Sequence, residues 1–138
     1  MKDVYQIFDE SLNTIRQFIE AYKFDNCTTI ASELIHVTSM ADYKDGIFIS
    51  EILETIFSNI SSLFGSYEIN DDDRKLIKEQ LKDQMGLLLK SYRDEDKAKI
   101  YHIVRDMRSM ATQFQFKCWN MMTEKSEPEI KRFVRRQM

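Results

Sequence analysis

The stretch that most constrains the fold of this chain is residues 97–122, which contain no glycine and no proline. Its apolar residues recur at alternating spacings of four and three, the period that keeps one stripe of an α-helix against its neighbours. A helix of 26 residues would be about 39 Å long. We predict that it is the central helix of a bundle. The stripe consists of Ile100, Val104, Met107, Ala111, Phe114, Cys118 and Met121.

The same period predicts helices over residues 2–23, about 26–41, 47–65 and 71–92. Asn70-Asp71-Asp72-Asp73 is a strong start signal, because a cap residue and carboxylates suit the unsatisfied N–H groups of a first turn. Asp94-Glu95-Asp96 repeats this pattern before residue 97. Gly46 is expected to supply a positive φ in a turn, and Gly65 to end the 47–65 helix.

The C-terminal residues 126–138 predict a further, short helix. Ser126-Glu127-Pro128-Glu129 fits a capping box with proline in the first turn. A helix this short must dock on the bundle or fray. Three glycines and one proline in 138 residues argue against a turn-rich β architecture. The sequence therefore predicts one all-α domain over 1–138, an antiparallel bundle of five main helices plus a short basic C-terminal helix.

Charge is distributed unevenly along the chain. Residues 1–66 carry 4 basic and 10 acidic side chains, a net charge of −6, whereas residues 97–138 carry 10 basic and 4 acidic ones, a net +6. The plain interpretation is scatter over solvated helix faces. The alternative is docking between oppositely charged ends, within one subunit or between subunits.

The two cysteines, Cys27 and Cys118, are far apart and both fall on predicted apolar faces, so we expect free, buried thiols. The N-terminus has no basic region followed by an apolar one, and no secretory signal is expected. Residues 47–64 come nearest to a membrane span, but Glu51 and Glu54 interrupt them. These features favour a cytoplasmic protein that does not contact a membrane.

Glu33 and His36 form an E-x-x-H pair, the spacing that places a carboxylate and an imidazole toward a metal in di-iron bundles. A complete site needs a second such pair, and His102 has Lys99 in the position of the glutamate. A solvent-exposed pair is the favoured interpretation, with metal binding as the alternative.

His102 and Asp106 are four residues apart, close enough to interact on one helix face. No nucleophile accompanies them in sequence, and there is no glycine-rich phosphate loop, H-E-x-x-H or G-x-S-x-G motif. The sequence leans away from an enzyme and indicates no cofactor. A metal-dependent enzyme, or one whose site is assembled only in space, stays open as an alternative.

The basic C-terminal end is a candidate nucleic-acid surface. Clustered Lys and Arg near aromatic side chains can bind a phosphate backbone. The whole chain is acidic, however, and a solvated or internally docked tail is favoured. The candidate residues are Lys131, Arg132, Arg135 and Arg136.

The predicted helices carry more apolar surface than one buried stripe needs, most of all the 97–122 helix. Either that helix is surrounded within one subunit, or the surplus forms a subunit interface. Since two-fold homodimers are the commonest oligomers, we expect a homodimer, with a further protein partner possible. The favoured function is a small helical protein-association module that self-associates; nucleic-acid binding is the first alternative.

Overall fold

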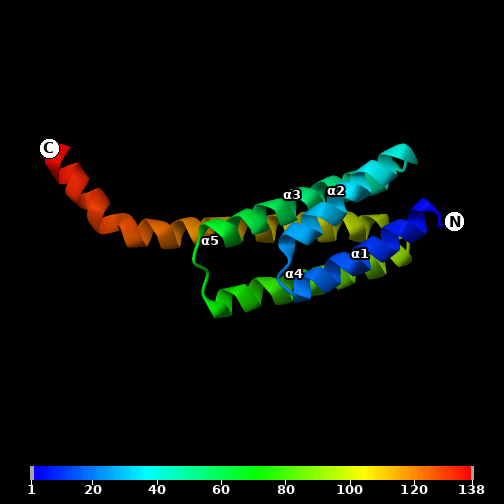
Figure 1. The fold of residues 1–138 in the computed structure, drawn as a ribbon, viewed down its shortest axis with the longest axis horizontal. Helices are drawn as coiled ribbons and strands as arrows, with labels where there is room; N and C mark the ends of the chain where they lie inside the picture. Colours follow the sequence, from blue (N-terminus) through cyan, green and yellow to red (C-terminus); the bar gives the residue numbers. More distant parts are fainter. Residues whose placement is uncertain (1, 138) are drawn as a thin grey trace.

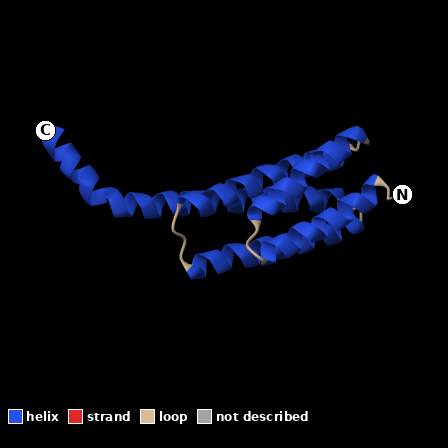
Figure 2. Cartoon of the chain, in the orientation of Figure 1, coloured by secondary structure: helices blue, strands red, loops and turns tan. Residues whose placement is uncertain are grey.

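A computed structural model of the chain describes the backbone of residues 2–137 and the side chains of residues 2–120. These residues form helices and loops without a strand, which confirms the all-α class (Figure 2). The five helices are α1 (Val4–Glu20), α2 (Phe24–Met40), α3 (Lys44–Ser66), α4 (Asp71–Arg93) and α5 (Lys97–Gln137).

A separate C-terminal helix is not confirmed. In the structure α5 is one continuous helix to Gln137, and it runs on past the ends of the other helices (Figure 1). The side chains of the predicted capping box at residues 126–129 lie outside those that the structure describes.

The helices pack as a ring. The main contacts join α1 to α2, α2 to α3, α3 to α5, α5 to α4, and α4 back to α1. Every helix therefore packs mainly against two others. The prediction that the 97–122 helix is central is wrong, because α5 is one member of this ring and its outer side is uncovered. Tyr101, Phe116 and Trp119 on α5 are 44%, 55% and 47% exposed.

Each helix turns one apolar stripe toward a shared core. The stripe predicted on α5 is buried from Ile100 to Cys118, and Met121 lies outside the described side chains. The spacing of the apolar residues therefore identified the buried side of the helix correctly. The largest fully buried side chains on the other helices include Phe8, Leu12, Ile15, Ile19, Leu34, Leu53, Phe57, Ile60, Leu81 and Met85.

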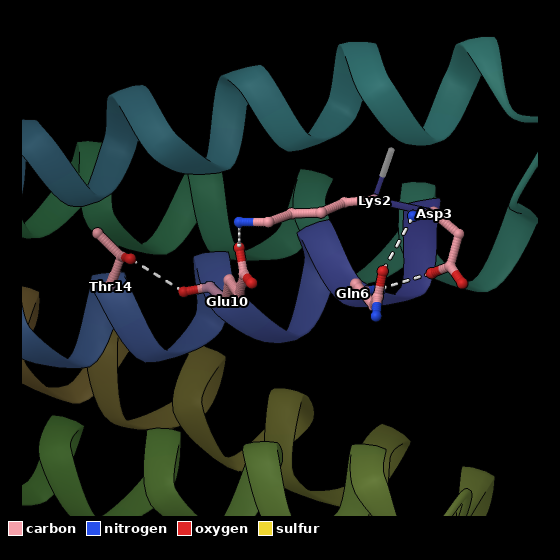
Figure 3. Close-up of polar contacts among 5 residues, drawn as sticks. All are labelled: Lys2, Asp3, Gln6, Glu10 and Thr14. Carbon is pink, nitrogen blue, oxygen red and sulfur yellow. Dashed lines mark hydrogen bonds and ion pairs between the residues drawn. The ribbon is translucent and has the colours of Figure 1, made fainter.

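Polar side chains cap the N-termini of α1, α4 and α5. The Gln6 N–H donates to Oδ1 of Asp3 at 2.9 Å, and the Asp3 N–H donates to Oε1 of Gln6 at 3.3 Å, which forms a capping box (Figure 3). Asn70 accepts from the Asp73 N–H at 2.8 Å, as the sequence predicts. Asp96 accepts from the Lys99 N–H at 3.2 Å and starts α5.

Three of the four loops share one geometry, although none of them contains a glycine. A residue with positive φ follows the helix end: Tyr22 (59°), Asp42 (52°) and Glu95 (55°). The next N–H donates to the carbonyl five residues earlier, as Tyr43 does to Thr38 at 2.9 Å. These are Schellman motifs, in which left-handed residues expose helix-end carbonyls to new donors. The predicted turn role of Gly46 is wrong, since Asp42 takes the positive φ and Gly46 lies inside α3.

Helices α2 and α3 make the most extensive helix pair. Small side chains allow this approach, with Ala31 and Thr38 buried on α2 and Gly46 and Ser50 on α3. The two buried hydroxyls donate to carbonyls of their own helices, Thr38 to Leu34 and Ser50 to Gly46, both at 2.6 Å. No buried hydroxyl at this interface is left without a partner.

Helix α3 is long and apolar enough to cross a membrane by length and composition alone. Several of its apolar side chains are buried in the bundle, namely Ile49, Leu53, Phe57 and Ile60. In its most apolar 18-residue window, 39% of the helix is buried in the bundle.

Candidate functional site: the α3–α5 face

Glu33 and His36 lie on the exposed side of α2, as the favoured interpretation expects. Among the side chains of residues 2–120, no group of three or more His, Cys, Asp or Glu is gathered in a way that could hold a metal ion. The fold therefore brings no further ligand to this pair.

His102 and Asp106 do pair on the surface of α5, with 3.3 Å between Nε2 and Oδ2. Their side chains are 74% and 55% exposed. His102 borders a groove between α3 and α5, but Asp106 does not. The pair is thus a solvent-exposed contact on one helix face.

Lys131, Arg132, Arg135 and Arg136 lie outside the described side chains. Within the described part of α5, Arg105 and Arg108 are exposed basic residues on its outer side.

The outer side of α5 carries a stripe in which aromatic residues flank arginines. Tyr101, Arg105, Arg108, Thr112 and Trp119 are spaced by four, three, four and seven residues, which keeps them on one helix face. Phe116 lies beside this stripe, its ring edge-on to Trp119 with centroids 5.7 Å apart. This stripe lies roughly 110° around the helix from the core stripe, on the flank of α5 that borders α3.

Helix α3 supplies the other half of the same surface. The Phe48 ring packs against Tyr101 with centroids 4.9 Å apart, and Phe48 is 38% exposed. Two open hollows, of about 520 and 600 Å³, lie along the seam between the helices and share Arg108. The first is bordered by Phe48 and Ile52, and the second by polar groups, where the Asn59 amide donates to Gln115 at 3.5 Å.

The charges on this surface are opposite in sign on its two helices. Glu51 and Glu54 lie on α3, and Arg105 and Arg108 on α5. None of these four side chains has an ion-pair partner among the described residues, whereas other acidic groups do, such as Asp73 with Lys117 at 2.6 Å. We call this surface the α3–α5 face, comprising Phe48, Glu51, Ile52, Glu54, Tyr101, Arg105, Arg108, Thr112, Phe116 and Trp119.

The sequence contained part of the signal for this face. Tyr101 and Trp119 are eighteen residues apart, five full helical turns, and so belong to one side of the helix. Nothing in the sequence paired that side with Phe48 or with the α3 glutamates, because the neighbour of α5 is chosen only by the fold.

No family model, no curated protein and no solved structure matches this chain.

Proposed function

We propose that the protein is a helical association module that self-associates as a two-fold homodimer through the α3–α5 face. One observation carries the proposal: unpaired acidic and basic side chains lie on adjacent helices of one surface, beside exposed aromatic rings. A surface that holds both signs side by side is complementary to a rotated copy of itself, which is the requirement of a two-fold contact.

The proposal includes the prediction from the short loops that consecutive helices are antiparallel. Since α4 separates α3 from α5 along the chain, α3 and α5 then run in the same direction. A two-fold axis that lies in the interface plane, parallel to these two helices, then lays the α3 helix of one subunit along α5 of the other, in the same direction. Because Phe48 is level with Tyr101, Glu51 would lie near Arg105 of the partner subunit and Glu54 near Arg108 of the partner subunit, each pairing occurring twice. Such complementary pairs fix the register of an interface and speed its formation.

The exposed aromatic side chains supply apolar contact area. Tyrosine, tryptophan and arginine are the residue types that most often dominate binding energy at interfaces. Here Tyr101 and Trp119 flank the two arginines on α5, so polar and apolar contacts would form together.

The nucleic-acid alternative is supported less well by the described residues. Arg105 and Arg108 could contact phosphates beside Tyr101, but Glu51 and Glu54 on the same face would repel a nucleic acid. That alternative predicts retention of the protein on single-stranded DNA or RNA at about 50 mM salt, lost steeply as salt rises. A cytoplasmic location fits the proposal, since it keeps both thiols reduced.

Analytical ultracentrifugation tests the dimer directly. The unaltered chain is expected to sediment as a dimer at micromolar concentrations. The pair Arg105→Glu and Arg108→Glu places like charges across the interface, and so does the pair Glu51→Lys and Glu54→Lys. Each double variant is expected to be monomeric, its dimer weakened by about 2 kcal/mol or more.

Mixing the two double variants gives the sharper result. An all-acidic face should bind an all-basic one, so equal amounts should form a heterodimer. Glu33→Lys, a charge reversal on the exposed side of α2, serves as the control and should leave the dimer intact. A monomer at high micromolar concentration, or variants that fail to recombine, would contradict the proposal.

A further inference from the structure

A third hollow lies at one end of the bundle. At this end α1 begins, and the α2–α3 and α4–α5 loops lie there as well (Figure 1). Its volume is about 650 Å³, within the range of about 300–1,000 Å³ typical of small-molecule sites. Two buried residues of the core, Ile49 and Ile100, contribute to its lining. We call it the end cleft.

Tyrosines line the end cleft. Four of the six tyrosines of the chain border it: Tyr5, Tyr43, Tyr92 and Tyr101. The Tyr5 and Tyr43 rings are 5.0 Å apart between centroids, and the Tyr92 hydroxyl donates to the Tyr5 carbonyl at 3.1 Å. Burial raises the pKa of both Tyr43 and Tyr92, so these phenols stay neutral. The cleft thus presents several tyrosine rings, of which Tyr5 and Tyr43 pack against each other.

Carboxylates outnumber cations around these rings. The lining includes five acidic side chains and two basic ones, Arg93 and Lys97. Arg93 is bound to both oxygens of Asp9, at 2.8 and 3.0 Å, and Lys97 lies 3.2 Å from Asp45. Glu10 also borders the cleft, and it is paired with Lys2 at 2.7 Å (Figure 3). Asp3 and Glu95 are then the two carboxylates of the lining without an ion-pair partner among the described side chains, and they leave an excess of negative charge.

We propose that the end cleft binds a small organic ammonium ion, whose apolar body contacts the tyrosine rings and whose charge is offset by the surrounding carboxylates. Aromatic faces attract cations through the ring quadrupole, and several tyrosines around one space are the chemistry that recognises alkylammonium groups. An anion would meet the same carboxylates and be repelled. The ammonium group could belong to a free amine or to a lysine side chain.

Titration calorimetry with phenethylammonium tests the site, with neutral 2-phenylethanol as the matched compound. The cation is expected to bind at least about fivefold more tightly than the alcohol. Nα-acetyl-lysine methylamide, which keeps its ε-ammonium group, tests the lysine source. Binding of both ammonium compounds indicates recognition of the ammonium group itself, and binding of phenethylammonium alone indicates a free amine. Equal binding of the cation and the alcohol would overturn the proposal.

Variants separate binding from folding. Tyr5→Leu removes an exposed ring and should weaken phenethylammonium binding about threefold to tenfold. Tyr67→Leu, which removes a tyrosine outside the cleft, is the matched control and should leave binding unchanged. Lys97→Gln frees the Asp45 carboxylate from its ion pair and should strengthen binding about threefold, a gain that damage to the fold would not produce. Weaker binding in Lys97→Gln, or an equal loss in Tyr67→Leu, would refute the site.

Discussion

A Cβ atom on Gly46 of α3 would lie 2.8 Å from Cγ2 of Thr38 on α2 and 2.5 Å from the Tyr43 ring. Cβ atoms essentially never make contacts this short, so a Cβ at position 46 would force Thr38 and Tyr43 to shift and would disturb the pairing of α2 with α3. A side chain at position 46 would therefore also displace the ring of Tyr43, which borders the end cleft.

We therefore expect Gly46→Ala to destabilise the protein. Overpacking costs about 1–3 kcal/mol, and the better helix propensity of alanine returns about 1 kcal/mol of that. Gly65→Ala, in the same helix, is the matched control, because a Cβ at position 65 would meet no other atom within 4 Å. Urea unfolding should give a lower midpoint for Gly46→Ala and an equal or higher one for Gly65→Ala. A rise at both positions would show that α2 and α3 are not packed this closely.

Glu95 is an exposed residue with a φ of 55° in the loop between α4 and α5. The left-handed conformation destabilises a residue that has a Cβ by roughly 1 kcal/mol, and glycine avoids this cost. Glu95→Gly should therefore raise the free energy of unfolding by about 0.5–1 kcal/mol, despite the greater flexibility of the unfolded chain. Asp94→Gly, next to it at φ −80°, should give no such gain. Chemical denaturation of the two variants makes the comparison, and equal effects would argue against the Schellman geometry.

Asp9 and Arg93 join α1 to α4, and the hydrogen bond from Arg93 holds the pKa of Asp9 below its usual value. A carboxyl with a lowered folded-state pKa stabilises the protein above its unfolded-state pKa of about 3.9, and this stabilisation is lost as pH falls through the folded-state value. Asp9→Asn should thus be less stable than the unaltered chain at pH 7.

The unaltered chain and Asp9→Asn should differ less in free energy of unfolding as the pH is lowered below about 3.9. This difference should vanish when Asp9 is protonated in the folded state. Urea titrations at several pH values measure it. Asp83→Asn, which removes an exposed carboxyl of α4 with no ion-pair partner among the described side chains, is the control and should cost less stability at pH 7 than Asp9→Asn does. A difference that stays constant from pH 7 to pH 2 would mean that Asp9 is not held by Arg93.

Cys27 and Cys118 are buried and free, as the sequence predicts. Burial raises the pKa of the Cys27 thiol to about 12 and also raises that of Cys118, so the reactive thiolate is scarce at pH 8. Iodoacetamide should modify neither residue in the native protein over the time in which an exposed cysteine, introduced by Ser39→Cys, is fully labelled. Both should react in denaturant. Rapid native labelling of Cys27 would show that α1 and α2 separate readily, since its Sγ lies 3.5 Å from the Ile15 carbonyl.

Sequence reasoning succeeded wherever the signal was local. The Asn70 cap, the helical class and the buried side of α5 all follow from a few neighbouring residues, since caps and apolar periods act within a turn or two. It failed for Gly46 because glycine is suited both to a turn and to close helix packing, and the identity of the neighbouring helix decides between them. The positive φ angles of Tyr22, Asp42 and Glu95 were not predicted, because none of these residue types marks a left-handed helix end as strongly as glycine does.

The amino-acid order by itself determined that helices form and which stripe of each one avoids water. Only the tertiary structure decided that α5 belongs to a ring and is not enclosed by it, that Tyr101 meets Phe48, and that four tyrosines from distant segments border one cleft. The physical reason is that burial is non-directional: an apolar stripe is stabilised by any apolar partner, so its period specifies which side is covered and leaves open which helix covers it.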